Sequence, residues 1–316
     1  MPFTARLAEH RNALEYGAAV TNPRAYADDG EPLSYWIDGP SDALDHRHAG
    51  APILTAHGLV SSTQHWRFFT PHFARARAVV SWNYRGHGGA PAPHTSEVSV
   101  AQFADDAHAV WQASGAAPAI VVGLSFGVQV ALELWHRHPA AVRALVLICG
   151  TSGHPLDRLT ASPKLRGAAT RLFRSVSQRP WLASGALGAL RTRAGRRVAR
   201  QLAYLSGGAL RADAPEAVLD DLFGHVAALD PALVGGVVAA YLDHTAEAVL
   251  PTIRVPTLII AGDRDQLTPV ATAARMQRAI PGSELVVFPG HTHLVQVEDP
   301  DGVHAAIDAF LARHAL

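Results

Sequence analysis

The segment Gly123-Leu124-Ser125-Phe126-Gly127 places a serine between two glycines, after an apolar run and before a helix-like sequence. A strand that turns sharply into a helix holds its central residue in a strained conformation, and flanking glycines remove side chains that would collide there. Such a turn raises the serine hydroxyl above the sheet, beside a helix N-terminus whose N–H groups favour developing negative charge. Ser125 is therefore a candidate nucleophile. The alternative is a glycine-rich turn with an incidental serine.

A serine hydroxyl is a poor nucleophile until a base removes its proton, and the base needs a carboxylate to orient it. Downstream of Ser125 the chain supplies both residue types, in the order Asp then His. Two acids, Asp263 and Asp265, follow one apolar run, and two bases, His291 and His293, follow the next. Because ligands bind at the carboxyl ends of strands in open α/β sheets, all four are candidates for one site. The predicted chemistry is acyl transfer through a Ser/Asp/His triad.

Alternating strands and helices would position these residues. Short apolar runs bounded by Gly, Pro or polar residues predict strands at Leu33–Ile37, Ile53–Ala56, Ala78–Trp82, Ala119–Val122, Ala144–Ile148, Thr257–Ala261 and Glu284–Phe288. The segments between them predict helices, most clearly at Val98–Ser114, Phe126–His136, Thr272–Ile280 and Val303–Arg313. Such alternation predicts an α/β fold, a mostly parallel, doubly wound sheet with helices on both faces.

The middle of the chain departs from this alternation. From about residue 151 to 250 the sequence contains no convincing strand, only helix-periodic segments rich in Ala, Leu and Arg. We therefore expect a core formed by residues 1–150 and 251–316, with a helical cap, residues 151–250, inserted between two strands of one sheet.

From about Asp28 to the C-terminus the chain resembles the α/β-hydrolase family, least closely through the helical insertion. The resemblance implies that Ser125 is the nucleophile. It also implies that Asp265 is the acid, since Gly262 and Pro269 match the ends of a Gly-x-x-Asp-x-x-x-Pro motif; Asp263 is its rival. Some family members place the base five residues before a glutamate, which favours His293 over His291 because Glu298 stands at that distance.

Two further turns are similar to family motifs. Thr55 to Val60 resembles the family's His-Gly oxyanion turn, which implies that the backbone N–H groups of Leu59 and Phe126 form the oxyanion hole and that His57 is structural. Ser81 to Ala90 resembles the structural Asp-x-Arg-Gly-x-Gly-x-Ser turn, but has Asn83 for the aspartate and Ala90 for the serine.

The function expected from these residues is hydrolysis of a carboxylic ester or related acyl compound through an acyl-enzyme. The serine nucleophile argues against the haloalkane dehalogenase and epoxide hydrolase chemistry of the family, which uses aspartate. Perhydrolysis, lactone opening, thioester cleavage, C–C bond hydrolysis and acyl transfer would reuse the same triad and stay open. A non-catalytic small-molecule receptor is disfavoured by the complete set of residues.

Composition narrows the possible partners. The 316 residues are 48% hydrophobic and 17% charged, with 27 basic and 27 acidic residues, so overall charge does not favour nucleic acid. A single cysteine, Cys149, excludes a disulfide framework and a Cys-based zinc module within the chain, and the His-x-His pairs lack convergent carboxylates. We expect no cofactor or metal. Without a signal-like or membrane-spanning apolar segment, we expect a cytoplasmic protein acting on a small molecule.

The charges are distributed unevenly. Between Arg158 and Arg211 the chain has eleven arginines, one lysine and no Asp or Glu, so the remainder carries 15 basic and 27 acidic residues. This basic segment could be the solvated face of amphipathic helices, a surface that attracts an anionic substrate, or a site of contact with anionic lipid.

Overall fold

The computed structural model describes residues 24–40, 44, 50–88, 90, 93–95, 97–115, 117–155, 171, 175, 179–205 and 216–316. Within these residues, one eight-stranded sheet has the order β1-β2-β4-β3-β5-β6-β7-β8. Its strands are β1 (Arg24–Tyr26), β2 (Pro32–Asp38), β3 (Ile53–Ala56), β4 (Val79–Trp82), β5 (Ala119–Leu124), β6 (Val142–Ile148), β7 (Thr257–Gly262) and β8 (Glu284–Phe288). Only the pairings of β1 with β2 and of β2 with β4 are antiparallel. The expected mostly parallel sheet is confirmed.

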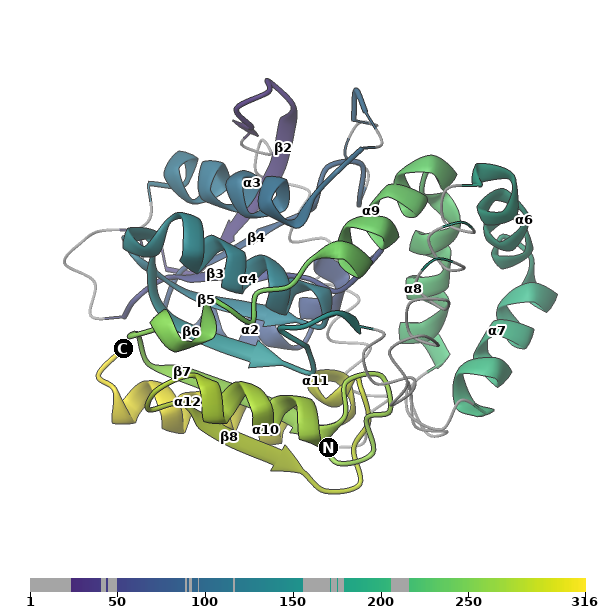
Figure 1. Cartoon of the computed structure of the whole chain (residues 1–316). Coiled ribbons are helices and arrows are strands. Elements are labelled where there is room, and N and C mark those ends of the chain that lie inside the picture. Colours follow the sequence, from purple (N-terminus) through teal and green to yellow (C-terminus); the bar gives the residue numbers. More distant parts are fainter. Residues whose placement is uncertain are drawn as a thin grey trace.

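Helices cover both faces of the sheet (Figure 1). The α-helices outside the insertion are α2 (Phe69–Phe73), α3 (Val100–Ala113), α4 (Phe126–Arg137), α10 (Val270–Ala279), α11 (Val295–Glu298) and α12 (Pro300–Arg313). Short 3-10 helices lie at η2 (Thr63–Trp66), η3 (Pro139–Ala141) and η5 (Leu250–Thr252).

Strand periodicity divides the core into two layers. In β5, Ala119 and Val121 pack into the layer shared with α3, α4 and α10, whereas Ile120 and Val122 pack into the layer shared with α2 and α12. Because parallel strands buried on both faces need apolar residues at every position, these strands are continuous apolar runs, which made them recognisable in the sequence.

The described part of the insertion between β6 and β7 is helical, as expected. Its described helices, which we call the cap, are α6 (Pro180–Leu190), α7 (Arg193–Leu205), α8 (Glu216–Ala228) and α9 (Pro231–Asp243). Asp230 caps α9 by accepting hydrogen bonds from the N–H groups of Ala232 (2.9 Å) and Leu233 (3.0 Å), with Pro231 at the first helical position. In Figure 1, α8 and α9 lie between the sheet and the outer pair α6 and α7.

Cap helix α8 contacts the core through a small apolar cluster. Val218 and Leu219 of α8 pack with Phe68, Leu294 and Val297 of the core. An ion pair between Arg67 Nη1 and Asp221 Oδ2 (2.9 Å) borders this contact. The cap therefore rests on the segment that follows His293.

No single helix among the described residues is long and apolar enough to cross a membrane. Residues Val218–Ala228 and Pro231–Asp243 reach that length and composition only as a pair, and they bend by 106° at their junction.

Candidate active site

Ser125 lies at a sharp turn between β5 and α4, with φ = 55° and ψ = −111°. The turn is closed by two near contacts that only glycine allows. A Cβ on Gly123 would lie 2.4 Å from the Gly127 carbonyl oxygen, and one on Gly127 would lie 2.0 Å from the Ala56 carbonyl oxygen. The Gly-x-Ser-x-Gly spacing is thus required by backbone packing, and the strained serine is held by structure on both sides.

The structure brings Ser125, His293 and Asp265 together. Ser125 Oγ lies 2.9 Å from His293 Nε2, and His293 Nδ1 lies 2.8 Å from Asp265 Oδ2. His293 is 8% exposed and Asp265 is 3% exposed, so the hydrogen bond between them is buried, whereas the one to the half-buried Ser125 is only partly so. A carboxylate that accepts the Nδ1–H leaves the Nε2 lone pair facing the serine hydroxyl.

Four hydrogen bonds hold the Asp265 carboxylate. Oδ1 accepts from the N–H groups of Leu267 (2.8 Å) and Thr268 (2.9 Å), while Oδ2 accepts from Thr268 Oγ1 (2.6 Å) and from His293. Burial alone would raise the pKa of Asp265, but the hydrogen bonds and charge of His293, followed by those from Thr268, outweigh it and leave that pKa below its ordinary value. The carboxylate therefore stays ionised beside the imidazole.

The loop that carries His293 is fixed from two directions. Thr292 donates from its N–H (2.8 Å) and its Oγ1 (2.5 Å) to the carboxylate of Glu298. On the β7 side, a Cβ on Gly262 would lie 2.4 Å from the His291 carbonyl oxygen, so the glycine that begins the acid motif lets this loop approach. The five-residue spacing between His293 and Glu298 therefore reflects a closed loop.

The two rival residues make other contacts. His291 Nδ1 lies 2.8 Å from the carbonyl oxygen of Pro289, and Asp263 Oδ1 accepts a 2.6 Å hydrogen bond from the N–H of Gly290. Both contacts stabilise the turn after β8. Neither side chain takes part in the hydrogen-bonded chain that reaches Ser125.

The turn after β3 borders Ser125. A Cβ on Gly58 would lie 3.8 Å from Ser125 Cβ, so Gly58 lies beside the serine, and Leu59 is the next residue in the chain. Phe126 is the first residue of α4, where backbone N–H groups have no partner within the helix. These two backbone positions, predicted as oxyanion donors, thus flank Ser125.

His57 is held as a neutral imidazole beneath this turn. Its Nε2 accepts from the N–H of Tyr84 (3.3 Å), and its Nδ1 donates to the Gly58 carbonyl oxygen (3.1 Å). Burial, followed by the neighbouring His87, lowers the pKa of His57 well below its ordinary value. Both ring nitrogens are occupied, which fits the structural role expected for this residue.

The turn after β4, which we call the arginine turn because it contains Arg85, is held by hydrogen bonds to neighbouring segments. Arg85 donates from Nε (2.9 Å) and Nη2 (2.5 Å) to Asp106 and from Nη1 (2.7 Å) to Asp29. Asn83, the departure from the family motif, accepts from the N–H of Thr63 (3.0 Å) and donates to the Gly88 carbonyl oxygen (3.3 Å). An amide therefore serves this turn where the family has a carboxylate.

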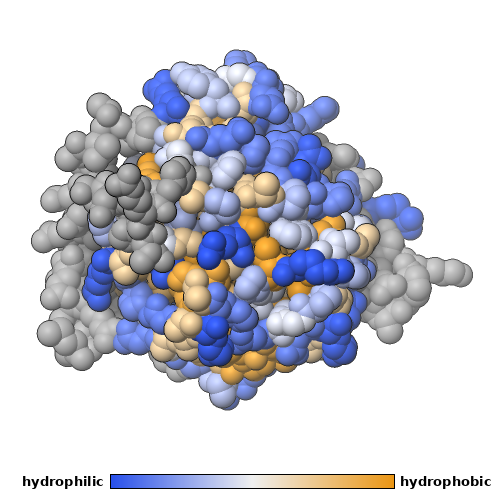
Figure 2. All heavy atoms as spheres, turned by 90° about the vertical axis from the view of Figure 1, so that its left-hand side faces the viewer, coloured by the Kyte–Doolittle hydropathy of each residue, from blue (hydrophilic) through white to orange (hydrophobic). Residues whose placement is uncertain are grey.

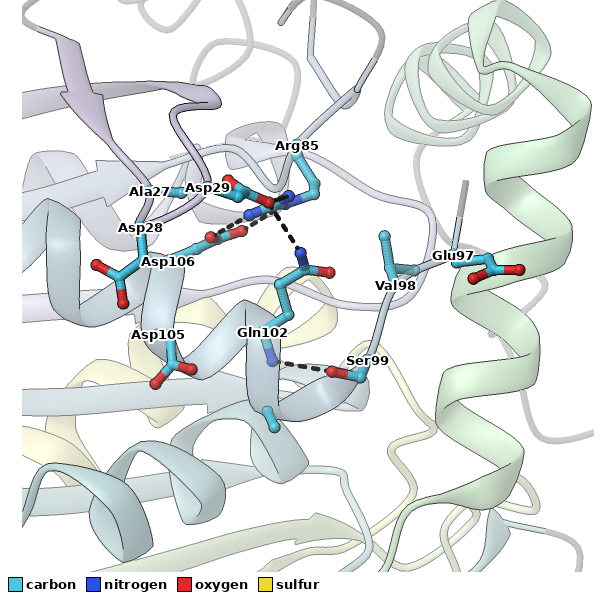
Figure 3. Close-up of a pocket in the computed structure, with 11 residues that line it drawn as sticks. Ala27, Asp28, Asp29, Arg85, Glu97, Val98, Ser99, Gln102, Asp105 and Asp106 are labelled. Carbon is cyan, nitrogen blue, oxygen red and sulfur yellow. Dashed lines mark hydrogen bonds and ion pairs between the residues drawn. The ribbon is translucent and has the colours of Figure 1, made fainter. Parts of the chain in front are cut away.

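A cavity of about 480 Å³ opens beside the arginine turn (Figure 3). Its wall includes Arg85, which pairs with both Asp29 and Asp106, and Asp105, which pairs with Arg137. None of the three residues of the Ser125 hydrogen-bonded chain lines it. Among the described residues, no group of three or more His, Cys, Asp or Glu side chains is placed to hold a metal ion.

Two contributors to the site had no signal in the sequence. Thr268 supports Asp265 from within the acid motif. Tyr241 of cap helix α9 packs its ring edge-on against Phe126, with centroids 5.4 Å apart, and its hydroxyl makes no hydrogen bond to a described residue. Burial and the nearby Asp265 carboxylate raise the pKa of Tyr241, so the phenol stays protonated as a donor. Only the three-dimensional contact of the cap with the core could identify it.

Known proteins resemble this chain over most of its length. At 27% identity over 277 residues, a 2-hydroxymuconate semialdehyde hydrolase of Pseudomonas sp. (strain CF600) matches 84% of this chain and 88% of its own length. The solved structure of an esterase from Exiguobacterium antarcticum matches with a TM-score of 0.71 at 19% identity, covering 92% of this chain and 100% of its own. Est816, described as an N-acyl homoserine lactone degrading enzyme, matches with a TM-score of 0.67 at 26% identity, covering 91% and 100%.

The alpha/beta hydrolase fold family matches residues 51–300, a range that includes the turn of Ser125, the acid motif and the histidine loop. The chain belongs to the alpha/beta hydrolase fold family of enzymes.

Proposed function

We propose that this chain is a serine hydrolase that cleaves a carboxylic ester or a related acyl compound through an acyl-enzyme. The observation that carries the proposal is the hydrogen-bonded chain from Ser125 through His293 to Asp265. The hydrolase names of its relatives support the reaction class, and the family uses this fold for small-molecule substrates.

The mechanism follows from the positions of the atoms. Ser125 Oγ attacks the acyl carbonyl carbon while His293 Nε2 accepts its proton, and Asp265 stabilises the imidazolium that forms. The N–H groups of Leu59 and Phe126 donate to the oxyanion, for which one such donor is worth about 3 kcal/mol in comparable enzymes. The imidazolium then returns the proton to the leaving group. Water, activated by the same imidazole, hydrolyses the acyl-enzyme and regenerates the serine.

Labelling with a fluorophosphonate probe tests the nucleophile directly. The wild-type protein should form one covalent adduct on Ser125, and Ser125→Ala should abolish both labelling and hydrolysis of p-nitrophenyl acetate. Ser283→Ala is the matched control, because its hydroxyl donates only to carbonyl oxygens of Gln277 and Ile280. Equal labelling of wild type and Ser125→Ala would refute the assignment.

A panel of p-nitrophenyl esters of increasing chain length, with and without alcohol acceptors, would then define the acyl group and separate hydrolysis from acyl transfer. An unlabelled wild-type protein that binds small molecules without turning them over would instead favour a receptor.

A further inference from the structure

The outer helices of the cap present exposed apolar side chains beside two arginines that form no ion pair with a described residue. Trp181 of α6 exposes 68% of its surface, and Val198 and Leu202 of α7 expose 58% and 62%. Side chains of this size are normally buried, and α7 places Ala194, Val198 and Leu202 on one face because they recur every four residues. We call Trp181, Ala194, Val198 and Leu202, with Arg193 and Arg197, the outer cap surface.

Arg193 and Arg197 lie on the adjacent face of α7, also four residues apart. Both are exposed, and neither forms an ion pair with a described residue. Residues 179–205 contain six arginines and no Asp or Glu, so no carboxylate within this stretch neutralises them. Helices α8 and α9 carry acidic residues, so the positive charge of the cap is concentrated in residues 179–205.

Packing does not use this surface in the described part of the molecule. Helix α7 lies on the far side of α8 from the sheet (Figure 1). By comparison, the end of the molecule opposite the cap is covered mostly by polar residues, with apolar residues in small areas between them and along one edge (Figure 2).

We propose that the outer cap surface docks on an anionic lipid bilayer, with α7 lying in the plane of the headgroups. A helix with arginines along one face and exposed aliphatic and Trp residues on the next fits the two zones of a membrane interface. Charge complementarity selects anionic headgroups. A small anionic substrate would need the arginines but would leave Trp181, Val198 and Leu202 unexplained, so the apolar stripe decides between the two ligands.

Flotation with sized vesicles tests this proposal and does not depend on catalysis. The full-length protein is mixed with vesicles of phosphatidylcholine alone or of phosphatidylcholine with 30% phosphatidylglycerol, at about 0.1 M salt. We expect the protein to float with the anionic vesicles only. Each arginine near an anionic surface contributes about fivefold to partitioning, so Arg193→Glu/Arg197→Glu should weaken binding by at least about 25-fold.

A second variant separates the apolar contribution from the charge. The double variant Trp181→Gln/Leu202→Gln keeps every charge, and glutamine at position 202 of α7 has good helix propensity. This variant should weaken vesicle binding by roughly tenfold or more. The charge control is Arg24→Glu/Arg143→Glu, which makes the same change in net charge at two exposed positions of the sheet and should bind as the wild type does. Circular dichroism and the urea unfolding midpoint of every variant report that the folds are intact.

Three results would overturn the proposal. They are equal binding of the wild type to both vesicle types, equal weakening by the cap and control charge variants, and unchanged binding by the Trp181/Leu202 variant. Sedimentation velocity tests whether the outer cap surface instead binds a second copy of the chain. If the wild type is a dimer that does not bind vesicles, and both cap variants are monomers, this surface is a contact between two copies.

Discussion

Replacing Asp265 by asparagine should reverse the direction of the hydrogen bond that orients His293. Asp265 Oδ1 accepts from two backbone N–H groups, so an amide at this position must keep its oxygen there. The amide nitrogen then takes the place of Oδ2, facing Thr268 Oγ1 and His293 Nδ1. Because that nitrogen donates, Nδ1 must be the acceptor, and the imidazole proton moves to Nε2. The base can then no longer accept the proton of Ser125.

The size of the effect follows from this change of tautomer. In related triads the wrong tautomer costs about ten-thousandfold in kcat, which corresponds to about 5 kcal/mol of transition-state stabilisation. We expect Asp265→Asn to lower kcat for p-nitrophenyl acetate by about this factor at pH 7.5, with circular dichroism and the unfolding midpoint close to those of the wild type. The two retained backbone hydrogen bonds are the reason that the loop should survive.

Asp263→Asn is the matched control. Its Oδ1 accepts from the N–H of Gly290, and the amide oxygen of asparagine can accept the same hydrogen bond, so kcat should stay within about twofold. If Asp265→Asn keeps more than a few per cent of wild-type kcat, or if Asp263→Asn loses more, then Asp265 does not orient the base.

Three further predictions concern the base, the pH response and the serine turn. His293→Ala should lower kcat at least a thousandfold and His291→Ala less than threefold, since only the first faces Ser125; the reverse ranking would move the base. Burial lowers the pKa of His87 to about 4, so the unfolded chain binds its proton first as pH falls below 6.5. The folded state should therefore lose about 2 kcal/mol between pH 6.5 and 5 through this group, and denaturation of His87→Gln should show a correspondingly smaller loss. Gly127→Ala should destabilise the fold by about 3 kcal/mol or prevent folding, because its Cβ would collide with a backbone carbonyl oxygen. Gly188→Ala is the control, because a Cβ at this position of α6 meets no atom within 4 Å. It should leave the free energy of unfolding in urea unchanged or raise it by up to about 1 kcal/mol.

The sheet was predictable because its strands are buried on both faces. Predicted strand ends lie within two residues of the observed ones, and those of β3 and β8 match; β6, for example, begins at Val142 where the apolar pattern suggested Ala144. Strand and helix types follow from such local patterns, which a single sequence contains. The positions of the cap helices relative to the sheet depend on contacts between residues far apart in the chain, and no local pattern encodes these.

The candidate site likewise contains residues that local sequence patterns predicted and residues that they did not. Ser125 was recognisable because backbone packing demands glycines on both sides, and His293 because Glu298 closes its loop at a fixed spacing. Thr268 and Tyr241 were not recognisable. A threonine in a turn and a tyrosine on an amphipathic helix have many ordinary uses, and only the fold places one beside Asp265 and the other against Phe126.

The contact of α8 with the core has a consequence for how this enzyme could diversify. Val218 and Leu219 pack on Leu294 and Val297, which lie one and four residues after His293. Exchanging the cap for one from another enzyme would remove the apolar support of the loop that carries His293. A chimaera would need matching residues at the α8 interface before its new specificity could be expressed. Recombination within this lineage should therefore favour exchanges that carry the histidine loop along with the cap.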